Sequence, residues 1–343
     1  MRVADRSTSR NFLKYLDTAK TNFAVTNERV ASGKRFTRIS DDVSAGTRAL
    51  RIRGDMAKAE EHYDNVKSIN EELTSTENAM TSISDIINKV HSQKVVKALN
   101  DATGDSGRTA IANEISSMKK EILQFANSKY YNRYVLGGSS ASTAPFSIND
   151  SGELLYNGVD VNSIKKDAAG KYFYLTDPTD DTTRKDIPMD GDIYVDIGLG
   201  IKLNADQVDK ETAFKVSYSG LEILGFGEEG GMSNNIYNII NDIEKAIRDN
   251  DMTKLGELDA RLVEQTQIFT ANLTDIGAKT SFLDTIQSRL EDEVDAYQSQ
   301  VSNIMGVNDA EEATKQTMND YVLKAVLSMG ANIIPSSLMD YLR

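Results

Sequence analysis

The 343-residue sequence contains no cysteine and no tryptophan, only two histidines and four prolines. The lack of cysteine excludes disulfides, thiol catalysis and thiolate metal sites. His62 and His91 stand outside any H-E-x-x-H or E-x-x-H spacing, so we expect each on the surface of a helix. Because no nucleophile and base can be paired from this set, we predict no enzyme, with no catalytic residue, no cofactor and no metal site.

Positive charge is also in short supply, since the net charge is -13 and the isoelectric point about 4.8. An acidic chain repels phosphate backbones and anionic membrane surfaces, so we expect neither nucleic acid nor membrane as a partner. No run approaches the roughly 18 to 20 apolar residues of a membrane span. The first residues lack the apolar stretch of a secretory signal peptide, and composition alone predicts a cytosolic protein.

Proline occurs only at Pro145, Pro178, Pro188 and Pro335, which leaves long proline-free stretches on both sides of the middle region. Proline breaks helix interiors, so this distribution permits very long helices at both ends. Apolar residues there step alternately by four and three, the spacing of helices that pack through a narrow seam. Such stripes cover residues 12–30, 45–66, 80–90, 111–125, 236–247, 283–304 and 318–333.

The middle of the chain has a different pattern. Between about residues 145 and 227 it is rich in Asp, Gly, Tyr and Val, with strand-like alternation in segments such as KYFYLT and IYVDIG. Asn157-Gly158 is the signal of a tight hairpin turn. We therefore predict a small β domain inserted between two helical halves.

One weak motif and one carboxylate pair are candidate sites in the sequence. The segment GAKT at 277–280 resembles the end of a P-loop, but the first glycine of that motif is missing. Asp41-Asp42 could serve acid–base work or bind a cation. At the start of a predicted helix, however, such residues are usually N-caps that complement the helix dipole.

The motif VASGKRF at 30–36 is followed by ISDDVSAG at 39–46 and TRAL at 47–50. With its glycine-to-aspartate spacing, this segment resembles the linker after the first helix in the flagellin superfamily, which comprises flagellins and hook-associated proteins. Physically, Gly33 permits the chain to turn, and Asp41-Asp42 start the next helix. The resemblance covers roughly residues 1–145 and 230–343, whereas the middle carries little family signal.

Further residues separate the members of this superfamily. The segment NRYVLGG at 132–138 and the ending SSLMDYL at 336–342 resemble the hook–filament junction proteins more than flagellins. Val43 stands where many hook-associated proteins have proline, which keeps flagellin, the filament subunit, as an alternative. A coiled-coil adaptor or adhesin is a further alternative, from the class of binding modules.

The resemblance implies a mainly α fold with an inserted β domain, in which N- and C-terminal helices pair as a coiled coil and an α bundle, a flagellin-like rod. We divide the chain accordingly into a terminal coiled-coil domain (1–40 with 305–343), a helical rod domain (41–144 with 228–304) and the inserted β domain (145–227). The net charge of residues 1–40 is +6, in contrast to the acidic whole.

The resemblance also implies a location and partners. A structural subunit of this kind is extracellular, in the bacterial flagellum, after export by the flagellar type III system without a cleaved signal peptide. Its partners would be other copies of itself in a ring or helical lattice, an adjacent hook-associated protein, flagellin and a dedicated export chaperone.

Two sets of residues are expected to carry assembly. We expect the terminal seams to meet each other and then neighbouring subunits. The predicted assembly interface comprises Phe12, Leu16, Phe23, Val30, Met318, Val322, Ala325, Met329, Ile333, Leu338 and Leu342. The predicted linker and turn motif comprises Gly33, Lys34, Arg35, Ser40, Asp41 and Asp42.

Overall fold

The computed structural model describes residues 2–333 except 101–103, 140–142, 169, 178–182, 188–190, 192, 201, 205–206 and 209–212. The chain forms two compact units. The terminal unit comprises residues 1–60 and 291–343, and the central unit comprises residues 61–290. Two long helices, α2 (Val43–Lys89) and α7 (Met252–Met305), contribute residues to both units.

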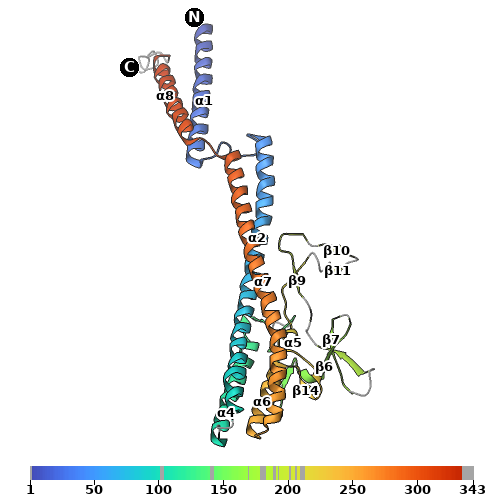
Figure 1. Cartoon of the computed structure of the whole chain (residues 1–343). Helices are drawn as coiled ribbons and strands as arrows, with labels where there is room; N and C mark the ends of the chain where they lie inside the picture. The colour runs from blue at the N-terminus through green and yellow to red at the C-terminus, as the bar shows by residue number, and fades with distance from the viewer. Residues whose placement is uncertain are drawn as a thin grey trace. The chain divides into compact units, whose positions relative to one another are not determined.

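Helices dominate the fold (Figure 1), and the predicted helical stripes are confirmed, because each falls on helical residues. The remaining long helices are α1 (Arg2–Ser32), α4 (Asp105–Ala126), α6 (Ile236–Arg248) and α8 (Asp309–Ile333). The short ones are α3 (Val96–Ala98), α5 (Gly220–Leu224), the π-helical turn η1 (Val90–Val95) and the 3-10 turn η2 (Val161–Ser163). No helix among the described residues has both the length and the apolar character that crossing a membrane requires.

Among the described residues, the strands are short and pair in six small antiparallel sheets. The two three-stranded sheets are formed by β3 (Phe146–Ile148), β4 (Leu154–Tyr156) and β5 (Val159–Asp160), and by β6 (Ile164–Lys166), β7 (Tyr172–Leu175) and β8 (Arg184–Asp186). The two-stranded pairs are β1 (Lys129–Tyr130) with β2 (Arg133–Tyr134), β9 (Tyr194–Val195) with β12 (Phe214–Lys215), β10 (Leu203–Asn204) with β11 (Gln207–Val208), and β13 (Glu228–Glu229) with β14 (Met232–Ser233).

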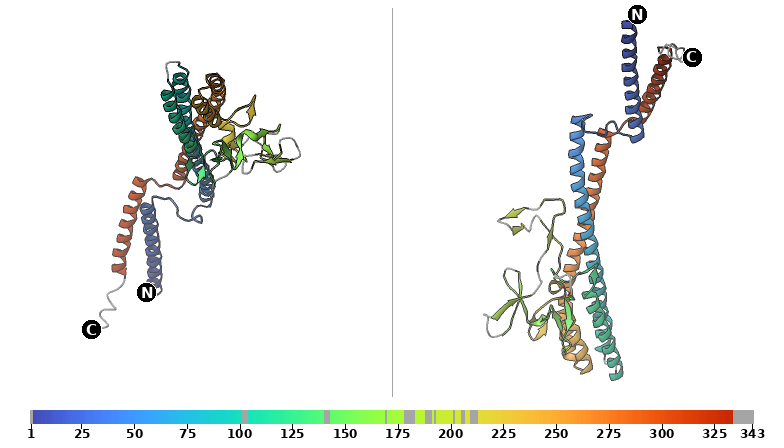
Figure 2. Two further views of the ribbon diagram at one scale, coloured as in Figure 1. Left: turned by 90° about the horizontal axis from the view of Figure 1, so that it is seen from below. Right: turned by 180° about the vertical axis from the view of Figure 1, so that it is seen from behind.

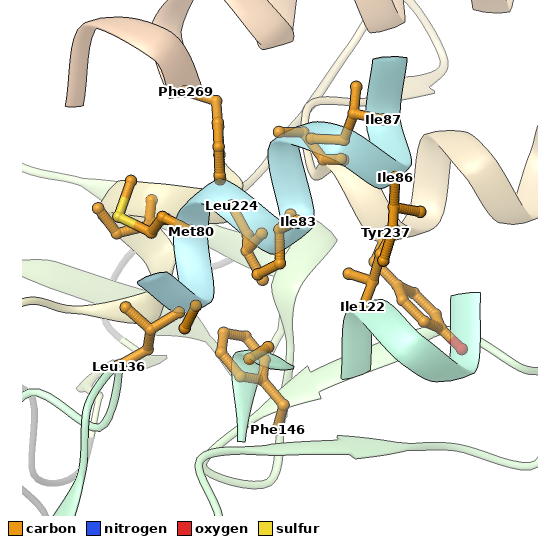
Figure 3. Close-up of a cluster of buried hydrophobic side chains, with 14 of the residues drawn as sticks. Met80, Ile83, Ile86, Ile87, Ile122, Leu136, Phe146, Leu224, Tyr237 and Phe269 are labelled. Atoms are coloured by element: carbon orange, nitrogen blue, oxygen red, sulfur yellow. The ribbon is translucent and has the colours of Figure 1, made fainter. Parts of the chain in front are cut away.

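One hydrophobic core runs through the central unit and joins its helices to its strands. The strands gather along one side of the helices (Figure 2). Figure 3 shows the residues where they meet: Met80 and Ile83 of α2, Ile122 of α4, Phe146 of β3, Leu224 of α5, Tyr237 of α6 and Phe269 of α7. The mainly α fold with an inserted β region is thus confirmed, and the insert and the helices share this core.

Candidate assembly surfaces

In the terminal unit, α1 and α8 lie side by side and run in opposite directions (Figure 1). Backbone hydrogen bonds join the segment that follows α1 to the last residue of α7 and to the segment between α7 and α8. The Arg35 N–H donates to the Met305 carbonyl at 2.7 Å, and the Val307 N–H donates to the Gly33 carbonyl at 3.2 Å. Gly33, directly after α1, has a φ of 64°, a left-handed conformation that glycine adopts without strain. These contacts hold the two helices next to each other where the chain leaves them.

Polar side chains join α1 to α8 in the half of the pair nearest the linker. Arg29 lies 3.5 Å from Glu312, which is only 2% exposed. The Asn319 side chain donates to the Thr26 hydroxyl at 3.3 Å. A buried carboxylate or hydroxyl is costly without a partner, so a shift of one helix against the other would be penalised. We infer that these contacts determine the register of the pair.

Towards the chain ends, the contact between α1 and α8 becomes apolar. The ring of Phe12 lies directly over Gly330, where a Cβ would stand 2.3 Å from the ring. Beside it is a groove of about 520 Å³ between the two helices. Its lining is formed by Thr8, Asn11, Phe12, Tyr15, Thr18, Ala19, Asn22, Val322, Val326 and Met329.

The structure places the predicted interface residues of the two helices differently. On α1, Phe12, Leu16, Phe23 and Val30 are all half-buried. On α8, by contrast, Met318, Val322, Ala325 and Met329 are exposed. Ile333 ends α8 without a described side chain, and Leu338 and Leu342 lie outside the described residues.

The face of α8 that turns towards α1 is displaced by one residue from the predicted stripe. It comprises Glu312, Gln316, Asn319, Leu323, Val326 and Gly330, which are buried or half-buried. The expectation that the predicted stripe of α8 meets α1 face to face is therefore corrected, although Val322 and Met329 flank the groove beside Phe12. The residues of the inner face are also spaced alternately by four and three. Because several of them are polar and one is glycine, a search for apolar stripes does not detect this face.

The linker between α1 and α2 is held by its predicted aspartates. Asp42 directly precedes α2 and is its N-cap, because its side chain accepts a hydrogen bond from the Ala45 N–H at 2.9 Å. The same carboxylate forms an ion pair with the guanidinium of Arg35 at 3.1 Å. Asp41 accepts the backbone N–H of Arg38 at 3.3 Å and the hydroxyl of Ser40 at 3.4 Å.

A small second core anchors this linker. Phe36, which sequence reasoning did not select as a site residue, is 6% exposed and packs with Ala45, Ala49 and Met305. The signal available in the sequence was a single aromatic residue among polar neighbours in the VASGKRF motif. Phe36 therefore ties the linker to α2 and to the end of α7.

Several titratable groups of the central unit are paired with one another. Lys119 of α4 lies 2.7 Å from Glu244 of α6, and Arg248 lies 2.8 Å from the same carboxylate. Burial alone would raise the pKa of Glu244, but the hydrogen bonds from Lys119 and Arg248 prevail and lower it. His91 pairs with Asp259 at 2.7 Å. Within the described part of the chain, no group of three or more His, Cys, Asp or Glu residues could hold a metal ion.

Residues 4–141 match the family model of the bacterial flagellin N-terminal helical region. Two curated relatives are each named flagellar hook-associated protein 3. The relative from Escherichia coli K12 is 26% identical over 121 residues, covering 35% of this chain and 38% of the relative. The relative from Salmonella typhimurium LT2 is 22% identical over 147 residues, covering 43% and 46% respectively. The chain thus spans less than half the length of the curated relatives it matches.

A solved structure described as a flagellar hook-associated protein from Vibrio parahaemolyticus has a similar fold. Its TM-score is 0.57 at 17% sequence identity, with 78% of this chain and 100% of that chain covered. At this identity the likeness concerns the fold alone.

Proposed function

We propose that this chain, whose residues 4–141 belong to the bacterial flagellin N-terminal helical family, is a non-enzymatic structural subunit that joins hook to filament in the flagellum. The observation that carries the proposal is the family match together with relatives named hook-associated protein 3. Those names favour the junction over flagellin itself. The linker motif that carries the resemblance is built into the terminal unit around Gly33, Phe36 and Asp42.

The terminal helices supply the surface for assembly in this proposal. Met318, Val322 and Met329 are between 41% and 68% exposed on α8, and Leu13 and Tyr15 are 61% and 65% exposed on α1. Apolar side chains gathered in this density on two paired helices are typical of a surface that another protein covers. The exposed residues Met318, Val322, Ala325 and Met329 would then face neighbouring subunits.

The remaining elements of the proposal concern route and partners. The subunit is exported by the flagellar type III system, without cleavage of a signal peptide, and acts outside the cell. Its neighbours are other copies of itself, an adjacent hook-associated protein and flagellin, and an export chaperone binds it before export. The subunit needs no cofactor for this role.

Deletion of the gene tests this proposal. We expect cells without the chain to make hooks that carry no filaments and to release filament protein into the medium, as seen by electron microscopy and by analysis of the supernatant. A plasmid copy should restore filaments. Filaments of normal length on the deletion strain would contradict the proposal, and a dominant band of this chain in sheared flagella would identify it as flagellin.

A further inference from the structure

The linker of the terminal unit carries a basic pocket. A hollow of about 400 Å³ is lined by Arg29, Lys34, Arg35, Arg38, Glu28 and Asp41, together with Val25, Phe36 and Thr37. It thus offers four cations against two carboxylates. The apolar residue Phe36 forms part of its wall. Because Phe36 is anchored in the small core with Met305, this part of the wall is held in place.

Two of the four cations are already paired within the chain, and two have no ion-pair partner among the described residues. Arg29 is paired with Glu312, and Arg35 with Asp42. Lys34 and Arg38 are exposed, and no carboxylate lies within ion-pair distance of either side chain in the described part of the chain.

The pocket's carboxylates do not supply the missing partners. Glu28 accepts the Thr37 hydroxyl at 2.8 Å, and Asp41 accepts the Arg38 backbone N–H. Lys34 and Arg38 therefore present uncompensated positive charge to a partner that binds in the pocket.

The same unit carries a matching acidic segment, which we call the α7 acidic run. It comprises Glu291, Asp292, Glu293 and Asp295, and residues 291–305 contain no lysine or arginine. Glu291, Asp292 and Asp295 are exposed and form no ion pair with any described residue. Glu293 accepts the Tyr297 hydroxyl at 3.0 Å.

The α7 acidic run lies too far from the pocket of its own copy to pair with it. The linker joins α7 at its last residue, Met305, whereas Asp295 lies ten residues earlier in the same helix. At 1.5 Å per residue this is about 15 Å along the axis. Exposed charges separated by more than about 8 Å are largely screened at physiological salt.

We propose that the basic linker pocket, through Lys34 and Arg38, receives the α7 acidic run of a neighbouring copy of this chain. The inference rests on the proposed function, because subunits in a ring or helical lattice meet through two different patches, one on each side. One terminal unit carries both patches, opposite in charge and unpaired within the copy. Charge complementarity of this kind favours encounter and fixes orientation more than it adds affinity.

Charge reversal tests the pairing. Lys34→Glu with Arg38→Glu, and separately Glu291→Lys with Asp292→Lys, should each weaken self-association of the full-length protein roughly tenfold at low salt, measured by sedimentation velocity. The two double variants mixed together should associate again, because the charges are exchanged rather than lost. Arg48→Glu with Arg51→Glu is the matched control, since it changes the charge equally on exposed residues of α2 outside the pocket, and should have a smaller effect.

A cross-linking experiment checks the contact directly and uses the absence of native cysteine. Arg38→Cys and Asp292→Cys are made in separate copies, mixed, and treated with a short bismaleimide. Heterodimers that form at low salt and disappear at high salt are expected. No heterodimer, together with unchanged association of both charge-reversed variants, would overturn the pairing. If the wild-type gene restores filaments in the deletion strain but the charge-reversed genes do so equally well, the inference fails while the proposed function stands.

Discussion

The ring of Phe12 on α1 rests on Gly330 of α8, so closely that a Cβ at position 330 would lie 2.3 Å from the ring. Gly330 is one of the few buried positions of α8. A glycine in a helix is destabilising by roughly 0.5–1 kcal/mol relative to alanine. Its presence here is explained by the close approach of the two helices.

Gly330→Leu should separate α8 from α1, because the new side chain occupies the space of the Phe12 ring. Phe12→Ala in the same chain vacates that space, so the double variant should regain part of the pairing. The pairing of α1 with α8 is measured by placing one cysteine on each helix in every variant and following disulfide formation. Equal cross-linking of wild type and Gly330→Leu would show that the contact does not hold the helices together.

The terminal helices should be marginal in the free subunit. On α1 only Ala19 and Thr26 are buried among the described side chains, and on α8 only Glu312 and Gly330. So little buried apolar area offsets only a small part of the roughly 1–2 kcal/mol per residue that ordering the backbone costs. Limited proteolysis of the free subunit should therefore trim both ends and leave a fragment from about residue 45 to about 300. Ends that resist cleavage in a proven monomer would argue against folding upon assembly.

Two substitutions separate the inner seam from the exposed stripe of α8. Leu16→Asp places a charge in the half-buried contact between the helices, which costs several kcal/mol unless the charge is paired. Met318→Asp places it on a side chain that is 68% exposed. Both should block incorporation into flagella, but only Leu16→Asp should weaken the α1–α8 pair, while melting of the central unit stays unchanged in both.

The control for these two variants is Thr317→Asp, an exposed position of α8 that lies away from both faces at 100° per residue. It should assemble normally. If Met318→Asp also assembles normally, the exposed stripe is not a contact between subunits.

In the central unit, Glu244→Gln should lower the free energy of unfolding by about 3 kcal/mol, because it leaves Lys119 buried without its counter-charge. Lys119 is 8% exposed and Glu244 is 9% exposed. Glu264→Gln is the matched control, since that carboxylate also pairs with an arginine but its side chain is 59% exposed. Urea denaturation should show a change below about 0.5 kcal/mol for the control.

The same ion pair predicts a pH dependence of stability. The pKa of Glu244 in the folded chain is below its ordinary value of 4.5, because Lys119 and Arg248 stabilise the carboxylate against the effect of burial. The contribution of Glu244 to stability is therefore complete above pH 4.5 and is lost as the pH falls through the lowered pKa. As the pH is lowered through this range, the free energy of unfolding should fall more steeply for wild type than for Glu244→Gln. Parallel curves for the two proteins would refute the assignment.

Local chemistry was enough to place the main helices. The absence of proline before Pro145 and the alternating stripes predicted the helices, and α1 ends at Ser32 just before Gly33 as the motif indicated. α2 begins at Val43, directly after the capping carboxylate of Asp42. These features depend on residues within one or two helical turns of each other, so they can be predicted from the local sequence alone.

The face by which α8 meets α1 was decided by the tertiary structure. The stripe through Met318, Val322 and Met329 is the more apolar, yet α1 packs on the neighbouring face with Asn319 and Gly330. The two faces differ by one residue, about 100° of helix rotation. What selects between them is the fit of Phe12 to a glycine and the polar partners Thr26 and Arg29, residues some three hundred positions away along the chain. Hydrophobic periodicity measures how apolar a face is, but not the shape and hydrogen-bonding groups of the helix opposite.

The sequence by itself therefore determined the class of fold, its long helices, its inserted strands and the chemistry of its linker, because each follows from short-range propensity and spacing. Only the tertiary structure decided which helix faces are paired and which stay exposed, and that the insert shares the core of the helices through Phe146 and Leu224. It also decided that Lys34 and Arg38 come together in one pocket while the α7 acidic run lies about 15 Å away along its helix. These outcomes depend on contacts between distant segments, whose geometry is a property of the packed chain and not of any local pattern.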